Sequence, residues 1–336
     1  MRAARVRALR ITAAHVIAAA LGLLPAVACL AAAPERGDAD RRRALVHDGI
    51  ERSYVVVAPA AATKPGARLP LVLVLHGGGG NAANAERMTG FTRKAHREGF
   101  VVAYPEGTGR FKDRLLTWNA GHCCGAAMAS RADDVGFIGA LLDRLAKDYP
   151  IDPRRVYATG MSNGGMMAHR LGRELPQRFA AVAPVVATVF GDEAKPAQPV
   201  SALMINGALD KAVPHLGGPP GGRFPGAWDG TPARPALEQG AFWAAANGCE
   251  GEPERSDRGA LAHWRYRCPR ARWSSSSWAT SATRGRAAWR AAAGATRRTA
   301  RSMRPPSSGS SSRRTRSSGP QGRRLISITG RAPSRG

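Results

Sequence analysis

The chain has 336 residues, 43% of them hydrophobic, which suffices for one large globular domain or two small ones and excludes disorder throughout. Its formal net charge of +26 would suit a nucleic-acid-binding protein, but sixteen arginines and no acidic residue lie from Arg270 to the C-terminus. The excess charge therefore belongs largely to this tail. The tail lacks lysine and any recognition motif, so we expect no nucleic acid as a partner. A tail that binds nucleic acid or an anionic surface through its arginines is the alternative.

The N-terminus has the pattern of a secretory signal peptide. A start rich in arginine is followed by the apolar run 11–33, which contains small residues suited to cleavage. We predict a signal peptide over residues 1–28, a linker over 29–42 and a secreted, extracellular protein. Pro25 breaks the apolar run and argues against stable membrane insertion. Cys29 directly follows the cleavage site, so a lipid anchor at Cys29 is the alternative to soluble export.

Export permits disulfide bonds, and four cysteines remain when Cys29 is assigned to the leader or to a lipid. Cys249 and Cys268 flank a hairpin-like segment and could pair. Cys123 and Cys124 are neighbours, and a bond between them is disfavoured by geometry. The sequence has no C-x-x-C pattern, so we expect structural cysteines and neither a metal site nor a cofactor.

Strand-like and helix-like segments alternate from residue 49 to 261. Short apolar or β-branched runs predict strands at 53–58, 71–75, 101–104, 156–159, 180–186 and 202–205. Apolar spacing predicts helices at 137–145, 164–175 and 235–246, the first capped by Asp133 or Asp134. This alternation predicts an α/β fold with a mainly parallel sheet and helices on both faces. Ligands of such sheets bind beyond the carboxyl ends of the strands.

Residues 160–164 read G-M-S-N-G and stand between a predicted strand and a predicted helix. In this order the pattern is typical of a nucleophile elbow, a tight turn that holds a serine in a strained, exposed position. Ser162 is therefore the candidate nucleophile. The alternative is an ordinary glycine-rich helix start, which the order of strand, motif and helix disfavours.

Two further polar segments also follow predicted strands. The glycine loop 76–81 could donate a backbone N–H, from Gly78, to a developing oxyanion, together with the N–H of Asn163 beside the candidate nucleophile. No G-K-[ST] follows this loop, which disfavours a phosphate loop. Asp210 is placed for the carboxylate that orients a catalytic histidine, although an ordinary turn residue is the alternative.

Several segments carry a family resemblance: L-H-G-G-G-G-N at 75–81, Y-P-E-G at 104–107, T-W-N-A-G at 117–121 with C-C-G at 123–125, D-D-V-G-F-I at 133–138 and Y-A-T-G-M-S-N-G-G at 157–165. Together they resemble the secreted poly(3-hydroxybutyrate) depolymerase and feruloyl esterase-like group of α/β-hydrolases over roughly residues 43–269. The resemblance implies an α/β-hydrolase fold and hydrolysis of polymeric or oligomeric carboxylic esters through Ser162 and Asp210. It also suggests that Trp118 lies near the substrate. A feruloyl or acetylxylan esterase and a non-catalytic binding protein with this fold are the alternatives.

The catalytic base is missing from the expected place. In the relatives the triad histidine lies late, in a G-H-T-W-P segment, and this sequence has no such segment. Only His215 and His263 follow the candidate acid. His215 is too close to act independently of the acid's own loop, and His263 alternates like a strand residue. We expect His76, which begins the glycine loop, to brace that loop.

The tail suggests why the base is absent. Residues 270–336 are rich in Arg, Ser and Ala, without helix or strand periodicity, and are predicted to be disordered. They are also residues of G/C-rich codons. With suitable codons, residues 281–286 read two nucleotides later spell G-H-T-W-P, 274–277 become a valine run and 306–316 become an amphipathic helix. We therefore predict that the tail is out of frame, that the esterase domain at 43–269 is truncated and that its activity is impaired.

Overall fold

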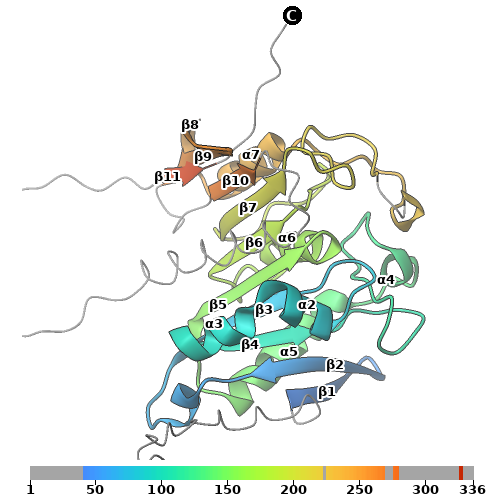
Figure 1. Ribbon diagram of the computed structural model, residues 1–336, viewed down its shortest axis with the longest axis vertical. Helices are drawn as coiled ribbons and strands as arrows, with labels where there is room; N and C mark the ends of the chain where they lie inside the picture. The colour runs from blue at the N-terminus through green and yellow to red at the C-terminus, as the bar shows by residue number, and fades with distance from the viewer. Residues whose placement is uncertain (1–40, 222–224, 269–274, 280–324, 328–336) are drawn as a thin grey trace, which may run out of the picture. The chain divides into compact units, whose positions relative to one another are not determined.

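A computed structural model describes residues 41–221, 225–268, 275–279 and 325–327. The predictions for the signal peptide, for Cys29 and for most of the tail lie outside these residues. The described strands form one mixed sheet in the order β1-β2-β4-β3-β5-β6-β7-β10-β11-β9-β8 (Figure 1). The strands are β1 Arg42–His47, β2 Ile50–Val57, β3 Leu69–Leu75, β4 Val101–Pro105, β5 Ile151–Met161, β6 Ala181–Val185, β7 Ser201–Gly207, β8 Glu250–Arg258, β9 Leu261–Arg267, β10 Ser275–Ala279 and β11 Leu325–Ser327.

The centre of the sheet is parallel, as the alternating sequence predicts. Strands β4, β3, β5, β6, β7 and β10 pair in parallel, whereas β1 with β2 and β8 with β9 form antiparallel pairs toward the two edges. Strand β3 shows why: Leu71, Leu73 and Leu75 enter one core cluster, and Val72 and Val74 enter another. Because both faces of the strand are buried, its apolar run is continuous.

Helices cover both faces of this sheet. Helices α2 (Ala82–Thr89) and α3 (Phe91–Glu98) pack on the face of Val72 and Val74. Helices α5 (Asp134–Asp148) and α6 (Asn163–Glu174) pack on the opposite face, with Trp243 of α7 (Ala236–Ala246) (Figure 1). The remaining described helices are short: α4 (Gly125–Ala129), η1 (Ala60–Thr63) and η2 (Pro225–Ala227). The predicted α/β class is confirmed.

Local signals explain where α5 begins. The Asp133 side chain accepts a hydrogen bond from the Gly136 N–H over 2.9 Å, so Asp133 is the N-cap and Asp134 the first helical residue. The side chain of Asp134 is fully buried and does not cap the helix. Its Oδ1 forms an ion pair with the Arg52 guanidinium over 2.6 Å. Of the two caps that the sequence leaves open, the structure selects Asp133.

Both neighbouring and distant cysteines are bonded. Cys249 and Cys268 form a disulfide at the base of the β8–β9 hairpin, in agreement with the sequence. The structure also joins Cys123 to Cys124, the pairing that the sequence disfavours. The Cys123–Cys124 bond follows directly on the loop of Trp118, so it lies close to the candidate site.

Two strands lie within the tail that is predicted to be irregular. Strand β10 pairs in parallel with β7, with Ala279 opposite Gly207. Strand β11 pairs with β9 and β10. The other tail residues lie outside the described part of the chain. Among the described helices, none combines the length and apolar character needed to cross a bilayer.

Candidate active site

Ser162 occupies the turn between β5 and α6 in a strained conformation. Its φ is 55° and its ψ is −125°, a region that L-residues rarely adopt. The Ser162 N–H donates to Val185 O over 2.9 Å, which ties the turn to β6. A Cβ on Gly160 would lie 2.2 Å from Gly164 O, and one on Gly164 would lie 2.3 Å from His76 O. The two glycines therefore allow the close backbone approach that an elbow needs.

The glycine loop packs directly against this turn. A Cβ built on Gly77 would lie 3.8 Å from the Ser162 Cβ, and one built on Gly78 would lie 3.6 Å from the Asn163 Cβ. Gly79 N–H donates to Leu116 O over 2.8 Å. The two N–H groups predicted to bind an oxyanion, those of Gly78 and Asn163, thus belong to backbone segments in contact.

Neither of these N–H groups has an acceptor among the described residues. For Asn163 this follows from its position, because the first N–H groups of a helix have no intrahelical partner. The Ser162 hydroxyl also has no hydrogen-bond partner among the residues that the structure describes. The backbone segments that carry this hydroxyl and these two donors are in contact.

The Asn163 side chain turns away from the surface and is 1% exposed. Its Oδ1 accepts from the Trp118 N–H over 2.7 Å, and its Nδ2 donates to Trp118 O over 2.9 Å. Two hydrogen bonds to one residue fix the peptide planes on both sides of Trp118 relative to the start of α6.

Trp118 and His76 extend this network to the glycine loop. The Trp118 indole N–H donates to His76 O over 3.0 Å, and the two rings lie 5.0 Å apart. The Gly107 N–H donates to His76 Nε2 over 3.0 Å, so Nδ1 carries the proton and donates to Gly77 O over 2.8 Å. Burial lowers the pKa of His76 to about 4, which keeps this neutral tautomer at physiological pH. The expectation that His76 braces the loop agrees with these contacts.

Trp118 itself is fully buried. A contact between its ring and a substrate would require the indole or the loop above it to move. The structure places Trp118 behind the two backbone donors, where its side chain supports the glycine loop. Its predicted role beside the substrate stays a prediction.

Asp210 follows β7 at the same edge of the sheet. Its Oδ1 accepts from the Ala212 N–H over 2.7 Å and from the Val213 N–H over 3.0 Å. This is the contact set of a turn residue. Because β6 separates β5 from β7, about 10 Å of sheet lies between the strands that precede Ser162 and Asp210. An imidazole ring would have to bridge this interval.

The two histidines that follow Asp210 stay apart from Ser162. The backbone of Ala208 hydrogen-bonds His215, and burial lowers the pKa of that imidazole. His263 lies on β9, where burial and the charges of Arg265 and Arg258 lower its pKa to about 4. Neither imidazole forms a hydrogen bond with the Ser162 hydroxyl within the described part of the chain.

His122 has a structural role that the sequence does not reveal. Its Nε2 lies 2.8 Å from Asp192 and its Nδ1 lies 2.7 Å from Asp229. Burial acts to lower the pKa of His122, but the hydrogen bonds and charges of Asp229 and Asp192 outweigh burial and raise it. His122 therefore ties together three loops beside the site. Only the fold brings these three positions together, so no local pattern could have indicated the contact.

One group of described residues approaches the spacing of metal ligands. The ligand atoms of His47, Asp48 and Asp133 lie within 4.8 Å of one another. The two aspartates are exposed, and Asp133 already caps α5. We assign no ion to this group.

Comparison with known proteins places this geometry in context. Residues 52–216 match the model of a family described as esterase PHB depolymerase. A protein of Nocardia uniformis subsp. tsuyamanensis named as an esterase, NocK, is 38% identical over 178 residues, which cover 52% of this chain and 50% of NocK. Feruloyl esterase B of Piromyces equi is 31% identical, with 62% of this chain and 38% of that protein covered.

Poly(3-hydroxybutyrate) depolymerase of Ralstonia pickettii is 32% identical over 148 residues, which cover 41% of this chain and 29% of that enzyme. The alignments thus span half or less of the length of these relatives. The matched family segment contains the elbow, the glycine loop and Asp210.

Proposed function

We propose, from the premise that this chain belongs to the PHB depolymerase-type esterase family over residues 52–216, that it is built to hydrolyse carboxylic esters through a Ser162 nucleophile. Related proteins carry the names of esterases, feruloyl esterases and a PHB depolymerase. Membership of this family supports an esterase fold and activity class. The serine mechanism and the fate of its triad are our proposal.

One observation carries the mechanism: Ser162 stands at φ 55° against Gly77, and the next residues of the two segments, Gly78 and Asn163, are also in contact. In the proposed reaction, Ser162 Oγ attacks the ester carbonyl carbon, and the carbonyl oxygen becomes an oxyanion that accepts from Asn163 and Gly78. Collapse of this intermediate breaks the bond to the alcohol and leaves an acyl-enzyme. Water then releases the acid and restores the serine.

Both steps need a base. In acylation it takes the proton from the serine hydroxyl and passes it to the leaving alkoxide, and in deacylation it takes a proton from the attacking water and passes it to Ser162 Oγ. In the proposal this base is a histidine, and Asp210 orients it. The described residues offer no histidine at Ser162. This polypeptide is therefore expected to turn over esters slowly, because the proposed nucleophile is not activated.

The position of β10 supports the proposal that the base is lost by a shift of reading frame. Ala279 ends β10 opposite Gly207, so the chain leaves the sheet at the edge where Asp210 also lies. Residues 281–286, which spell G-H-T-W-P two nucleotides later, follow almost at once. Residues 274–277 would become a valine run in that frame, which suits a parallel strand beside β7.

Polymeric or oligomeric hydroxyalkanoate esters are the proposed substrates, with feruloyl and acetyl esters of polysaccharides as the second candidates. The N-terminal pattern supports export as the route to such substrates, with a lipid anchor at Cys29 as the alternative.

Restoring the frame tests the mechanism. Deleting or inserting nucleotides near the Pro269 codon should yield a chain that cleaves p-nitrophenyl butyrate and whose Ser162 is labelled by a fluorophosphonate. Ser162→Ala should abolish both signals, and the matched control Ser130→Ala should retain them. A restored chain that folds but neither turns over the ester nor reacts would favour the non-catalytic binding protein.

The gene itself tests the frame proposal separately. Sequencing across the codons for residues 265–290 should reveal codons that encode G-H-T-W-P after a two-nucleotide shift. Codons that cannot encode this segment in any frame would overturn the frame proposal. The nucleophile proposal would still stand on the labelling of Ser162.

A further inference from the structure

A strap formed by residues 108–117 lies against the glycine loop. Thr108 and Thr117 exchange two backbone hydrogen bonds of 2.8 Å, which close the strap into a hairpin. The Gly79 N–H donates to Leu116 O over 2.8 Å, which fixes the end of the strap to the glycine loop. Most residues between the two threonines are exposed, so the strap forms part of the surface beside this loop.

Leu115, near the end of the strap, is both exposed and strained. It is 60% exposed and has a φ of 54°. A single exposed leucine is ordinary on a protein surface. A left-handed backbone is not, because the Cβ of an L-residue then crowds the carbonyl oxygen that follows it. Glycine would relieve this strain and would expose no apolar group. The stability of the fold therefore does not explain a leucine at this position.

The Leu115 side chain lies against the part of the glycine loop that carries the proposed oxyanion donor. A Cβ built on Gly79 would lie 4.0 Å from Leu115 Cδ2. Gly79 directly follows Gly78, and consecutive Cα atoms are about 3.8 Å apart. A Cβ built on Gly78 would lie 3.6 Å from the Cβ of Asn163, the residue after Ser162. Leu115 therefore offers an apolar surface one residue away from the proposed donor.

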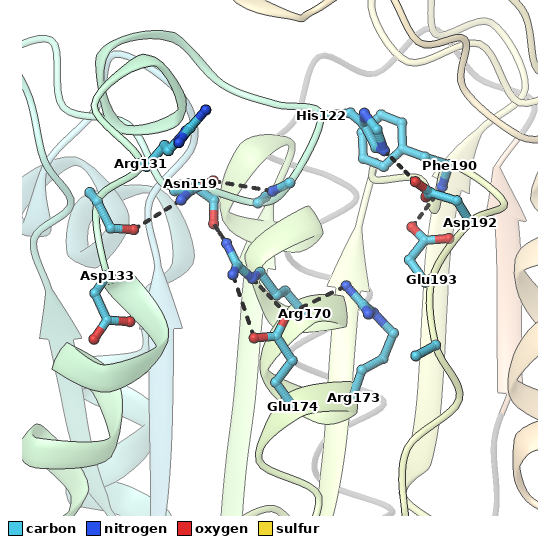
Figure 2. Close-up of a pocket in the computed structure, with 14 residues that line it drawn as sticks. Asn119, His122, Arg131, Asp133, Arg170, Arg173, Glu174, Phe190, Asp192 and Glu193 are labelled. Atoms are coloured by element: carbon cyan, nitrogen blue, oxygen red, sulfur yellow. Dashed lines mark hydrogen bonds and ion pairs between the residues drawn. The ribbon is translucent and has the colours of Figure 1, made fainter.

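A cavity of about 500 Å³ beside the second half of α6 is a separate place (Figure 2). Ser162 and Leu115 are not among its lining residues. Its wall carries several charged side chains, which are Arg131, Asp133, Arg170, Arg173, Glu174, Asp192 and Glu193. An apolar chain that covered these groups would remove water from them without replacing its hydrogen bonds, which is costly. An aliphatic ester therefore does not suit this cavity.

We propose that Leu115 is a specificity-determining residue that packs against an alkyl chain of the bound ester. The inference rests on the proposed function, because it takes Gly78 and Ser162 as the place where the ester carbonyl binds. The glycines of the loop have no side chains, so Leu115 supplies apolar surface there. Each methylene group that leaves water against this surface strengthens binding. The contact favours hydroxyalkanoate and other aliphatic esters over acetyl esters.

Direct binding tests the contact in the chain as it stands, because slow turnover leaves the ester intact. Saturation-transfer NMR titrations would compare butyl butyrate with methyl acetate. Butyl butyrate has an alkyl chain on both sides of its carbonyl group, so the result does not depend on which side faces Leu115. It should bind at least about tenfold more tightly than methyl acetate.

Variants assign this preference to one side chain. Leu115→Ala should weaken the binding of butyl butyrate at least about threefold, because apolar contact is lost, and should affect methyl acetate less. Leu115→Met keeps a flexible apolar side chain and should retain most of the affinity. Leu237→Ala is the matched control, since it removes the same atoms from an exposed leucine on α7 and should leave the affinity unchanged.

Leu115→Gly separates binding from stability. We expect that the midpoint of urea unfolding does not fall, because glycine relieves the left-handed strain. The loss of butyl butyrate affinity should be at least as large as in Leu115→Ala. A lower midpoint with unchanged affinity would assign Leu115 to the fold and overturn the proposal.

Kinetics of the frame-restored chain distinguish this inference from the proposed function. The ratio of kcat/KM for p-nitrophenyl butyrate to kcat/KM for p-nitrophenyl acetate should fall about threefold in Leu115→Ala. An unchanged ratio would retain the proposed function and overturn the role of Leu115. A folded restored chain that cleaves neither ester would overturn the proposed function, while the binding titrations would still decide on Leu115. Unchanged butyl butyrate binding in Leu115→Ala, or an equal loss in Leu237→Ala, would overturn the inference.

Discussion

The side-chain amide of Asn163 is joined to the backbone of Trp118 by two hydrogen bonds, one accepted over 2.7 Å and one donated over 2.9 Å. Trp118 in turn donates to His76 O, and His76 donates to Gly77 O. This chain of contacts leads from the start of α6 to the glycine loop and fixes the spacing of the two proposed oxyanion donors.

Trp118→Phe should keep most of the ring packing but leave His76 O without its donor. A buried acceptor left unsatisfied costs about 1–3 kcal/mol, so the free energy of unfolding measured with urea should fall by this amount. In the frame-restored chain, kcat toward p-nitrophenyl butyrate should also fall while KM stays nearly constant, because the Gly78 N–H acts on the transition state.

Trp243→Phe is the matched control for Trp118. The Trp243 indole is also fully buried and donates to His169 Nδ1 over 2.9 Å, but it lies on α7 and has no contact with the glycine loop. The Trp243→Phe variant should lose a similar free energy of unfolding, but its kcat should not fall selectively. Equal losses of kcat in both variants would mean that Trp118 acts through global stability alone.

Gly164→Ala should be severely destabilising. A Cβ at this position would lie 2.3 Å from His76 O and 2.6 Å from Leu75 O, and neither backbone atom can yield without disturbing β3. Gly139→Ala, inside α5, has nothing within 4 Å of its Cβ and should be neutral or stabilise the protein by up to about 1 kcal/mol. Thermal unfolding followed by circular dichroism distinguishes the two; a stable Gly164→Ala protein would contradict the elbow geometry.

The tie between His122, Asp192 and Asp229 should depend on pH. The pKa of His122 is raised, so its stabilising contribution is fully present below pH 6.5 and is lost as pH rises through the folded pKa. The His122 hydrogen bond lowers the pKa of Asp192. Burial acts to raise the pKa of Asp229, but its hydrogen bonds have the larger effect and lower that pKa. The stabilising contribution of the two aspartates is therefore present above pH 3.8 and is lost only as pH falls below this value.

Comparing the wild-type chain with His122→Gln measures this contribution. The difference in unfolding free energy should be on the order of 1 kcal/mol near pH 6, because the groups are partly exposed, and should shrink toward pH 8.5. His96→Asn, an exposed site on α3, should show no such dependence. A His122 difference that is constant across this range would exclude an ionic tie.

The Cys249–Cys268 bond should stabilise the β8–β9 hairpin. Its cysteines are separated by 19 residues, and a closed loop of this size is worth about 3 kcal/mol in the chain-entropy model. A double Cys249→Ala and Cys268→Ala variant should lose about this much stability in a urea titration. Counting free thiols in denaturant, with and without reductant, should confirm the bond; two free thiols from this pair in the untreated protein would contradict it.

The sequence predicts the centre of the sheet well because burial dictates it. The run from Leu71 to Leu75 is apolar at every position, as a strand buried on both faces must be. Helix α5 begins after Asp133, one of the two caps that the sequence leaves open. By contrast, α2 and α3 were not expected, because these short helices are dominated by polar residues and are interrupted at Gly90. Their helical state depends on packing against Val72 and Val74.

The sequence by itself determined the elbow, because the glycine spacing around Ser162 specifies a local backbone turn with few alternatives. It also determined that the glycine loop and Asp210 follow strands. Only the tertiary structure decided that Trp118 is buried behind the proposed donors, that His122 joins three loops and that Arg173 faces a cavity. These relationships connect residues far apart in the chain, and their partners are selected by packing rather than by local pattern.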